Sequence, residues 1–484
     1  MPSIEQLIQE RKEKRDQIAS FGMDPYPVSS FRTHRIADVL ASFSDFSDPV
    51  WVSGRIMAIR EHGGVTFFDI LDGSSKIQVV LKEDEVADPD QYQLFVDAVD
   101  VGDFVDVHGN PTETSTGEKS VAANKWRMLA KALRPIPSQW SGLEDTQKCL
   151  RKRYIDILMN DEVREMIQMR SRFWKAMRTF LEKRDFLEVQ TPVLETTPGG
   201  ADARAFTSYH NALDMEVYLR ISAGELWQKK LLVGGFEKVF EIGRIFRNEG
   251  ISPEHAQDYM QMEFYWAYAD HEDGMELVKE LYRHIAESVF ETQEFTIRGH
   301  DVDLGDTWQR FDYVETIEEM AGIDVSASSR EDIIDVLENK GIDCEDDIMR
   351  VRAVDQLWKD CRKQISGPGF LVNVPKDLSA LAKRQSQDNQ MVAQFQPIIA
   401  GSELGKGYSE LNNPTEQHER FKDQQKLREQ GDKEAQHYNE RFVEALEHGM
   451  PPACGFGVSE RLFAFLVDKP IKQAQIFPLL RPKD

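Results

Sequence analysis

Residues 237–270 read EKVFEIGRIFRNEGISPEHAQDYMQMEFYWAYAD, in which two strand-like segments flank a polar loop. Successive side chains of a strand point to opposite faces, so alternate residues share a face. One face of the second segment carries Met260, Met262, Phe264, Trp266 and Tyr268, and the other carries Tyr259, Gln261, Glu263, Tyr265 and Ala267. In the first segment Phe240, Ile242 and Phe246 lie opposite Glu241 and Arg247. We predict an antiparallel pair that buries one face and lines a cavity with Arg247, Tyr259, Glu263 and Tyr265, although an ordinary half-exposed hairpin would show the same alternation.

The composition is that of an acidic protein of two or three domains. The chain has 484 residues, with 59 Lys and Arg against 84 Asp and Glu, and a formal net charge of −25. Contact with a nucleic acid must therefore use local basic patches, because phosphate affinity comes largely from basic groups. The four scattered cysteines form no CxxC pair, which argues against a structural zinc site and a disulfide framework. The sequence has neither the apolar core of a signal peptide nor the roughly 20 apolar residues that span a bilayer, so we expect a cytoplasmic protein without membrane contact.

Turn residues and apolar periodicity predict the organisation of the chain. An amphipathic helix is expected over residues 3–20. Short strand-like runs at 51–59, 65–71, 77–81 and 104–108, bounded by glycine-containing turns, predict a small closed barrel, and residues 135–142 have the composition of a linker. Helical spacing predicts an amphipathic helix over 162–183, and residues 315–365 are mostly helical and acidic. Glycine-punctuated runs follow at 395–411 and 453–466, the second grading into a helix.

Residues 237–270 resemble motif 2 of the class II aminoacyl-tRNA synthetases, in which the run Phe246-Arg247-Asn248-Glu249 precedes a strand that bears Glu263. Other segments resemble lysyl-tRNA synthetases in the same order, and several long motifs in order are more specific than one short pattern. They are GGADARAF (199–206), YLRISAGEL (218–226), KKLLVGGFEKVFEIGR (229–244), PKDLSALAKR (375–384), ELGKGYSELNNP (403–414) and LEHGMPPACGFG (446–457). The resemblance covers nearly the whole chain and is weakest over 315–365.

The resemblance implies an α+β protein in which an N-terminal OB-fold β-barrel is followed by the class II synthetase antiparallel sheet, of six to seven strands, flanked by helices. The expected domains are residues 1–138, the N-terminal helix plus the anticodon-binding barrel, and 139–484, the catalytic domain with a helical insertion at about 315–365. The helix at 162–183 matches motif 1, which builds the interface of a homodimer. The implied activity is that of a lysine–tRNA ligase, which uses ATP and Mg²⁺ to activate lysine and transfers it to tRNA(Lys).

The same resemblance assigns residues to ATP and metal. Arg247 would bridge the α-phosphate and the lysine carboxylate, a task suited to a planar fork of donors, and Arg461 would act with it as the second catalytic arginine. Glu249 and Tyr259 would hold the adenine, and His255 would contact the outer phosphates. Glu403 and Glu410 are the expected metal ligands, since magnesium is bound by one or two carboxylates plus phosphates.

Lysine carries two ammonium groups and one carboxylate, so its pocket needs two anionic ends and one cationic anchor. By resemblance Glu225 would take the α-ammonium, Arg247 the carboxylate, and Glu410, helped by Tyr265, the ε-ammonium. Glu263 would be the second acid of the pocket. A mispaired buried charge is costly, so such a pocket discriminates by several kcal/mol.

In the barrel, the positions that match the family's anticodon-reading residues are Arg60, Phe67, Gln78 and Glu118. Phe67 would stack on a splayed base, which is worth roughly 1–3 kcal/mol. A basic run follows at Lys119, Lys125, Arg127, Lys131 and Arg134. This run is either a local RNA-binding patch or a solvated strand edge.

Three positions depart from the family pattern. Lys406 replaces the asparagine usually found beside the bound lysine, where a cation would repel the substrate unless a glycine-rich bulge turns it away or toward phosphate. If the bulge does so, Lys406→Asn should change lysine affinity little, and a large improvement would refute this explanation. Gln396 stands where a second magnesium-binding glutamate is frequent. Motif 3 is one residue shorter than usual between Pro452 and Arg461, with Glu460 in place of the common aspartate.

Two alternatives follow from these departures. The chain could be a class II ligase for another amino acid, with aspartate or asparagine the next candidates, although Glu225 and Glu410 argue against aspartate. It could also be a catalytically degenerate paralogue that binds RNA, which Lys406 and Gln396 alone favour.

Overall fold

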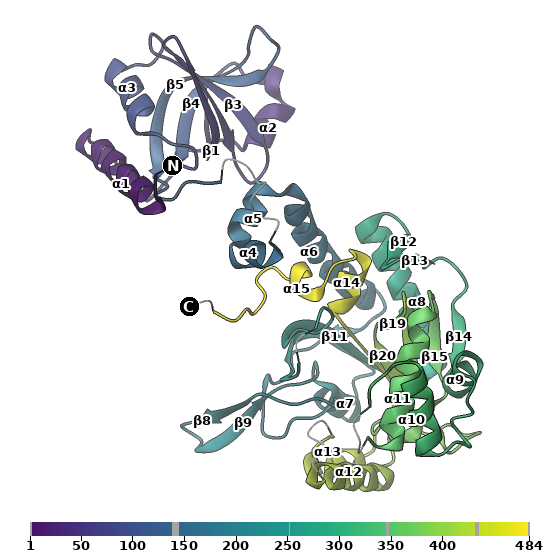
Figure 1. Cartoon of the computed structure of the whole chain (residues 1–484). Helices are drawn as coiled ribbons and strands as arrows, with labels where there is room; N and C mark the ends of the chain where they lie inside the picture. The colour runs from purple at the N-terminus through teal and green to yellow at the C-terminus, as the bar shows by residue number, and fades with distance from the viewer. Residues whose placement is uncertain (1, 138–144, 251, 345–347, 431–434, 483–484) are drawn as a thin grey trace. The chain divides into compact units, whose positions relative to one another are not determined.

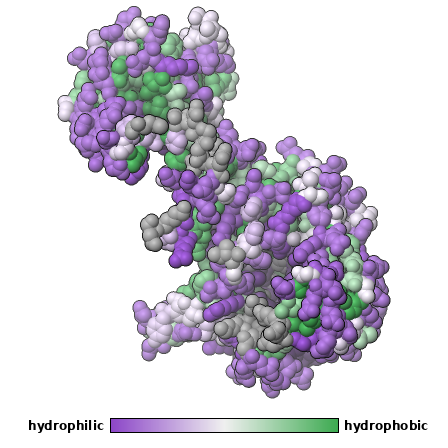
Figure 2. All heavy atoms as spheres, in the orientation of Figure 1, coloured by the Kyte–Doolittle hydropathy of each residue, from purple (hydrophilic) through white to green (hydrophobic). Residues whose placement is uncertain are grey.

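The computed structural model describes residues 2–137, 145–250, 252–344, 348–430 and 435–482. The chain divides into two compact units, Met1–Glu144 and Asp145–Asp484. The domain boundary expected between residues 138 and 139, and most of the linker predicted at 135–142, lie outside the described residues. Figure 2 shows a mainly hydrophilic surface, in keeping with the net charge of −25.

The first unit is a closed five-stranded barrel with three α-helices and one 3₁₀ turn among its described residues (Figure 1). The strand order is β1-β2-β3-β5-β4, in which β3 and β5 are parallel and the other neighbours are antiparallel. This confirms the predicted barrel. The elements are α1 (Ile4–Ser20), α2 (Ile36–Ala41), η1 (Phe43–Asp45), β1 (Val50–His62), β2 (Val65–Leu71), β3 (Lys76–Lys82), α3 (Pro89–Ala98), β4 (Phe104–Glu113) and β5 (Lys119–Ala130).

Helix α1 confirms the helix predicted over residues 3–20. It begins at a capping box in which the Ser3 side chain accepts from the backbone of Gln6 and the Gln6 side chain accepts from the backbone of Ser3. The strands alternate between buried and outward-facing residues, as in β2, where Phe68 and Ile70 are buried and Phe67 and Asp69 are partly exposed. One face of each strand therefore fills the barrel, and the other remains available for contact.

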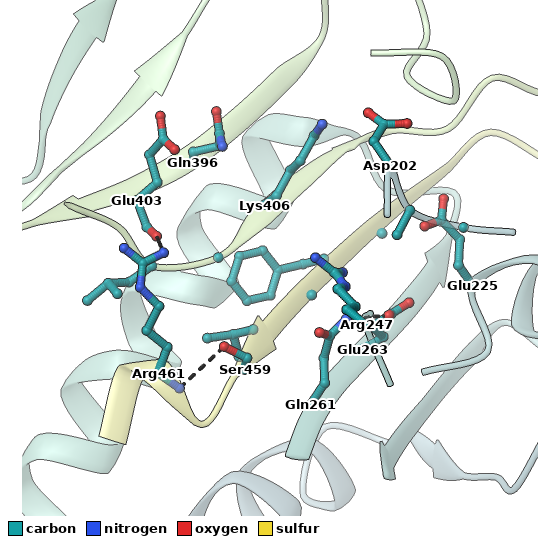
Figure 3. A pocket seen from close by; sticks show the side chains of 18 of the residues that line it. Asp202, Glu225, Arg247, Gln261, Glu263, Gln396, Glu403, Lys406, Ser459 and Arg461 are labelled. Carbon is teal, nitrogen blue, oxygen red and sulfur yellow. Dashed lines mark hydrogen bonds between the residues drawn. The ribbon is translucent and has the colours of Figure 1, made fainter. Parts of the chain in front are cut away.

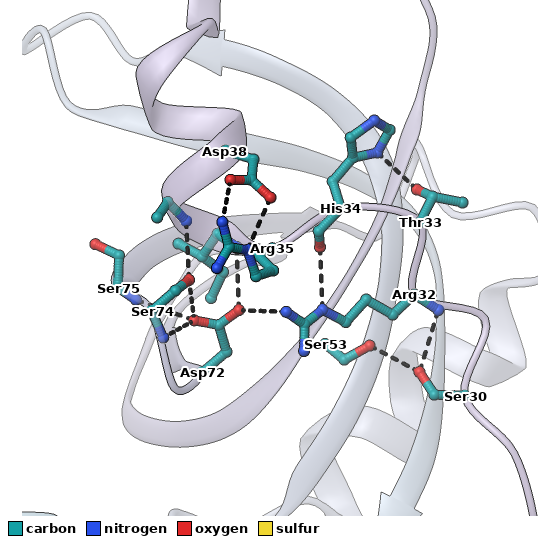
Figure 4. A network of polar contacts seen from close by, with 12 residues as sticks. Ser30, Arg32, Thr33, His34, Arg35, Asp38, Ser53, Asp72, Ser74 and Ser75 are labelled. Atoms are coloured by element: carbon teal, nitrogen blue, oxygen red, sulfur yellow. Dashed lines mark hydrogen bonds and ion pairs between the residues drawn. The ribbon is translucent and has the colours of Figure 1, made fainter. Parts of the chain in front are cut away.

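A polar network around Asp72 joins the segment before α2 to the turn between β2 and β3 (Figure 4). The Asp72 carboxylate accepts from the backbone N–H of Ile36 (3.1 Å) and Ser75 (3.0 Å) and from the Ser74 hydroxyl (2.6 Å). It also pairs with Arg32 at 3.3 Å. Burial raises the pKa of this carboxyl, but the hydrogen bonds outweigh burial and hold the pKa below its ordinary value.

Replacing Asp72 by alanine is expected to lower the free energy of unfolding by about 2–3 kcal/mol, because it leaves several backbone donors unpaired. The measurements are thermal unfolding of the full chain and hydrogen exchange of residues 29–45. Because the folded pKa is lowered, the stabilisation is present above the unfolded pKa of about 3.9 and is lost as the pH falls through the folded pKa. Asp38→Ala is the control, since the side chain of Asp38 forms an exposed ion pair with Arg35 (2.8 Å), and solvent screens such a pair strongly. Equal effects of the two variants would contradict the prediction.

The second unit is built on a nine-stranded sheet of order β14-β15-β18-β20-β21-β11-β10-β6, with β19 paired to β18. The six strands from β15 to β10 are antiparallel, but β14 and β6 add to the edges in parallel. The expected sheet of six to seven antiparallel strands is therefore correct at the centre and wrong at the edges, where short strands extend it. The strands are β6 (Leu187–Glu188), β10 (Lys238–Phe246), β11 (Asp258–Ala267), β14 (Gln309–Asp312), β15 (Gly369–Val372), β18 (Gln394–Ile399), β19 (Ser402–Glu403), β20 (Lys406–Ser409) and β21 (Ala453–Ser459).

Smaller sheets and helices surround this sheet. The order β7-β9-β8 forms a sheet whose strands β8 and β9 make a projecting hairpin (Figure 1). The remaining strands are β7 (Leu194–Glu195), β8 (Thr207–His210), β9 (Met215–Leu219), β12 (Glu294–Ile297), β13 (His300–Asp303), β16 (Val374–Pro375) and β17 (Met391–Val392). The helices are α4 (Thr146–Arg151), α5 (Arg153–Met159), α6 (Asp161–Glu182), α7 (Glu225–Val233), α8 (His271–Ile285), η3 (Ala286–Phe290), α9 (Tyr313–Ala321), α10 (Arg330–Asn339), α11 (Arg350–Cys361), η4 (Arg362–Gln364), η5 (Lys376–Leu378), α12 (Pro414–Glu429), α13 (Glu440–Glu447), α14 (Arg461–Leu466) and α15 (Ile471–Ala474).

The two faces of the sheet belong to different apolar cores. On one face Met262, Phe264 and Phe456 pack with residues of α6, α8 and α14. On the other face Tyr265 and Tyr408 pack with residues of α7, α9 to α11 and α13. Helix α6 confirms the amphipathic helix predicted over 162–183, and α9 to α11 confirm the helical character of 315–365, apart from residues 345–347, which lie outside the description. In the part of the chain that the structure describes, every helix is too short or too polar to cross a bilayer.

Candidate active site

A cavity of about 550 Å³ opens on the sheet face that carries Tyr265 and Tyr408. Arg247, Tyr259, Glu263 and Tyr265 line it, as the alternation in residues 237–270 predicts. The pairing of Phe240 with Phe264 and of Glu241 with Glu263 confirms the antiparallel pair, and Phe240 and Phe264 are fully buried on the opposite face. Glu241 does not line the cavity, because it forms a buried ion pair with Arg220.

Glycines of β21 keep the floor of the cavity open. A Cβ atom at Gly455 would lie 2.2 Å from Oε1 of Glu410 and 2.5 Å from the Tyr265 ring. A Cβ atom at Gly457 would lie 3.1 Å from Cγ of Glu263. Contacts under 3.0 Å are not tolerated, so the absence of a side chain at Gly455 leaves room for Glu410 and Tyr265. Gly457 relieves a tighter than usual contact with Glu263 in the same way.

Three glutamates from three elements meet at one end of the cavity. Glu225 is the first residue of α7, Glu263 is central in β11, and Glu410 follows β20; their exposures are 5%, 3% and 1%. Burial, followed by the charge of Glu225, raises the pKa of Glu263 to about 7. Burial also raises the pKa of Glu410 to about 8, although Lys229 opposes this shift.

Lys229 is the main component that the sequence reasoning missed. It lies one turn after Glu225 on α7, and its Nζ is 2.7 Å from Oε1 of Glu225 and 2.5 Å from Oε2 of Glu410. An i, i+4 Glu–Lys pair on a helix is usually a surface pair, so only the packing of α7 against β11, which brings Lys229 to Glu410, identifies this lysine as part of the site.

Tyrosines complete this end of the cavity. We expected Tyr265 to assist Glu410, but its hydroxyl donates to Oε2 of Glu263 (2.9 Å). Oε1 of Glu263 accepts from the backbone N–H of Ala223 (2.6 Å) and from Gln261 (2.6 Å). The hydroxyl of Tyr408, which the sequence reasoning did not single out, donates to Glu225 (2.5 Å).

Arg247 lies beside these acids, directly after β10. Its Nε donates to the carbonyl of Ile221 (3.2 Å), and its Cζ is 5.9 Å from the ring centroid of Tyr259. Within the described ranges, its two terminal nitrogens have no hydrogen-bond or ion-pair partner. Figure 3 shows the guanidinium inside the cavity beside Glu263. It is a half-buried planar donor in position to take a bidentate anion.

Cationic groups gather at the other end of the cavity. Arg461, the first residue of α14, donates to the backbone carbonyl of Glu403 (3.2 Å) and pairs with Glu254. Glu254 also pairs with Arg298. His255 lines the same region and contacts the Ser252 hydroxyl (2.7 Å); burial, followed by the charge of Arg461, lowers its pKa. The cavity therefore has an acidic end and an end suited to anions.

Comparison with known proteins agrees with this geometry. The family model for class II tRNA synthetases (D, K and N) matches residues 145–481, and a model described as an OB-fold nucleic acid binding domain matches residues 50–129. The lysine–tRNA ligase of Fervidobacterium nodosum is 40% identical over 476 residues, which are 97% of this chain and 92% of that protein. The lysine–tRNA ligase of Carboxydothermus hydrogenoformans is 40% identical over 487 residues (99% of each chain), and that of Thermotoga maritima 37% over 491 (99% and 97%).

This chain belongs to the lysine–tRNA ligase family of class II tRNA synthetases. Arg461, which matches the motif 3 arginine of this family, lines the cavity although motif 3 is one residue shorter than usual. Glu460, the accompanying departure, points elsewhere: it is buried, pairs with Arg170 and accepts from Gln475 (2.5 Å). It therefore holds the start of α14 in place and does not contact the cavity.

Glu249 and Tyr259, the adenine-binding candidates of this family member, also line the cavity. Tyr259 is buried, and its ring faces the Arg247 guanidinium. The charge of Glu249 lies close enough to influence both residues. A purine beside Tyr259 would thus lie close to Arg247, between the acidic end of the cavity and Arg461.

The two expected metal ligands lie in different environments. Glu403 is partly exposed, and its Oε1 accepts from the Trp358 indole N–H (2.6 Å). Glu410 is fully buried in an ion pair with Lys229, which a metal ion would have to displace. Across the described ranges, no group of three His, Cys, Asp or Glu could hold a metal by itself. We correct the expectation for Glu410: it belongs to the acidic end of the cavity and is not a metal ligand.

Lys406 and Gln396 both line the cavity. Lys406 begins β20 directly after Gly405, whose φ of +121° is in the region that favours glycine. Its Nζ lies 6.0 Å from the ring centroid of Tyr408. In Figure 3 the Lys406 side chain extends away from Glu263 and Arg247, on the side where Gln396 lies. The geometry agrees with a bulge that turns the ammonium away from the acids.

In the barrel, Arg60, Phe67 and Gln78 share the outward face of β1 to β3. Arg60 pairs across the strands with Phe67, and Gln78 with Asp69. Arg60 lies 3.5 Å from Asp69, a residue of this face that the sequence reasoning missed. Glu118 is exposed just before β5, which pairs with β3 at Ser120 and Gln78.

The basic run of the barrel does not form a single patch. Lys131 is buried between Asp100 (2.5 Å) and Asp103 (2.8 Å). Arg127 pairs with the buried Asp106 (2.9 Å). These two residues are part of the internal packing of the unit, so the interpretation of the whole run as an RNA-binding patch is wrong.

Proposed function

We propose that this chain is a lysine–tRNA ligase that activates lysine with ATP to lysyl-adenylate and transfers the lysyl group to the 3′ end of tRNA(Lys). The observation that carries the proposal is the presence of Glu225, Glu410 and Arg247 in one cavity. Lysine offers an ammonium to each acid and a carboxylate to the guanidinium. The buried acids Glu225, Glu263 and Glu410 outnumber Lys229 and Arg247 by one charge, which the net positive charge of lysine balances.

Oε1 of Glu410 supports the assignment of the ε-ammonium. It is buried without a hydrogen-bond partner among the described residues, and it lies beside Gly455 on the floor of the cavity. A buried carboxylate oxygen without a partner is costly, and a ligand ammonium removes that cost. Glu225 would take the α-ammonium, while Glu263, whose oxygens already accept from protein donors, would supply charge and hold Tyr265.

ATP is the second substrate of this family, and the arginines support its placement. Arg247 would bridge the α-phosphate and the lysine carboxylate, while Arg461 and His255 would contact the outer phosphates. Adenine would lie beside Tyr259 and Glu249. Arg461 pairs with Glu254, so the triphosphate would replace that carboxylate. The rate enhancement comes from positioning and charge neutralisation, since no protein nucleophile is needed.

We further propose that Mg²⁺ accompanies ATP. Glu403 fits such an ion as one carboxylate beside the phosphates, a donor set that magnesium accepts. Bound there, the ion would neutralise phosphate charge. Arg461, which donates to the backbone carbonyl of Glu403, supplies fixed positive charge at this end of the cavity, which would compensate for Gln396 in place of a second carboxylate.

The outward face of the barrel is the proposed contact for the anticodon, through Arg60, Phe67, Gln78 and Glu118. A homodimer is proposed from the segment after α6, where β6, at the edge of the main sheet, exposes Leu187 (47%) and β7, at the edge of the three-stranded sheet, exposes Leu194 (50%). Exposed apolar side chains on a strand edge favour association. The proposed location is the cytoplasm, where tRNA(Lys), lysine and ATP are present.

Exchange of pyrophosphate into ATP, measured with each of the twenty amino acids, tests the function. We expect exchange with lysine. Exchange with aspartate or asparagine instead would make the chain a ligase for that amino acid. Binding of tRNA without exchange for any amino acid would identify an RNA-binding paralogue.

A further inference from the structure

Lys229 lies behind the wall of the cavity. Its side chain is 2% exposed and does not contribute to the lining, whereas the two acids that it contacts do. The rings of Tyr265, Tyr408 and Phe442 surround its Nζ at 5.7, 5.4 and 5.9 Å from their centroids. This aromatic enclosure excludes water and leaves the two carboxylates as the charged partners of the ammonium.

Lys229 contacts one oxygen of each acid. It takes Oε1 of Glu225 and Oε2 of Glu410, so that Oε1 of Glu410 is turned toward Gly455 and the cavity. The Tyr408 hydroxyl donates to the same oxygen of Glu225. The second oxygen of each acid therefore remains for a ligand.

We propose that Lys229 is a positioning residue that holds one oxygen of Glu225 and one of Glu410 and so aims their free oxygens at the two ammonium groups of the substrate. The proposal rests on the proposed function and extends it: selection of a dicationic amino acid depends on a fixed cation behind the acids. A structural ion pair alone would stabilise the fold without affecting how lysine binding depends on pH.

The groups packed around Glu410 explain why a cation is required. Glu225 and Lys229 face it from α7, Glu263 and Tyr265 from β11, Tyr408 from β20 and Cys454 from β21. Of these, Lys229 alone favours the ionised form of Glu410 by its charge. Without it, burial and the charges of Glu225 and Glu263 would raise the pKa of Glu410 still further, and a neutral carboxyl attracts an ammonium weakly.

The test compares Lys229→Met and Lys229→Arg with the unchanged protein in lysine-dependent pyrophosphate exchange from pH 6.5 to 9. We expect Lys229→Met to raise the lysine KM about 10- to 100-fold at pH 7.5, with the KM for ATP changed less than about 3-fold. The rise in lysine affinity with pH should shift upward by about one unit or more. Lys229→Arg should restore most of the affinity, because it keeps the cation.

Lys230→Met is the matched control. Lys230 is the next residue of α7, and its Nζ lies over the Trp227 ring (4.7 Å), away from the acids, so its lysine KM should not change. An unchanged lysine KM in Lys229→Met, or a loss that is equal at every pH, would overturn the proposal. If Lys229→Met does not fold, Lys229→Arg is compared with the neutral variant Lys229→Gln. A loss of lysine affinity in Lys229→Arg that is as large as in Lys229→Gln would refute a role of Lys229 through its charge. Absence of lysine-dependent exchange in the unchanged protein would instead refute the proposed function.

Discussion

Replacing Arg247 with lysine is expected to lower kcat/KM for lysine-dependent pyrophosphate exchange by about 1000-fold. The planar guanidinium offers parallel donors that a single ammonium cannot reproduce, and its Nε is already fixed by the Ile221 carbonyl. In the proposed complex it contacts both reacting anions, whose charge is redistributed in the transition state. The loss should therefore appear in kcat as well as in the KM for lysine.

Arg244→Lys is the matched control for this variant. Arg244 lies on β10, three residues before Arg247, but it is exposed and pairs with Asp258 at the surface. Its replacement should change kcat/KM less than about 3-fold, since exposed ion pairs contribute about 0–1 kcal/mol. A loss of less than 10-fold in Arg247→Lys, with the protein folded, would remove Arg247 from the bridging role.

The sequence predicted the parts of the site that depend on local periodicity. The alternation in residues 237–270 identified Tyr259, Glu263 and Tyr265 as cavity residues, because the side-chain period of a strand is two and the opposite face is plainly apolar. The barrel and helix α6 were also predictable from local patterns: the barrel from short strand-like runs bounded by turns, and α6 from apolar residues at helical spacing. The outer strands β6 and β19 were not, since a two-residue strand has no period and forms only through its neighbours.

The contacts between distant segments could not be predicted. Lys229 and Glu410 are far apart in sequence, and the burial that makes Lys229 a component of the site arises only when α7 packs against β11 and α13. The hydrogen bond of Tyr265 to Glu263 was not predicted either: two residues apart on β11, the two side chains share a face and pair locally, while the assistance of Tyr265 to Glu410 in lysine binding stays a prediction. The basic run of the barrel was ambiguous because pattern alone does not tell a buried ion pair from a surface charge.

Replacing Glu410 with glutamine is expected to raise the lysine KM by about 100- to 1000-fold, because the ε-ammonium and Lys229 then share too little negative charge. In the unchanged protein the raised pKa of Glu410, about 8, makes lysine binding dependent on pH. A bound ammonium favours the carboxylate and lowers this pKa, so binding releases a proton below pH 8. Lysine affinity should accordingly rise with pH, by up to about tenfold per unit, and level off above about pH 8.

Glu410→Gln should flatten the part of this profile near pH 8 and leave a weaker dependence from Glu263, whose pKa is about 7. The measurement is the lysine KM in pyrophosphate exchange from pH 6 to 8.5, with the KM for ATP followed in parallel. Glu444→Gln, an exposed position on α13, controls for the loss of a negative charge as such. An unaltered pH profile in Glu410→Gln would show that another group governs lysine binding. Glu410 could then not be the residue that contacts the ε-ammonium, because a buried carboxylate with a raised pKa that contacts a cationic ligand must release its proton when that ligand binds.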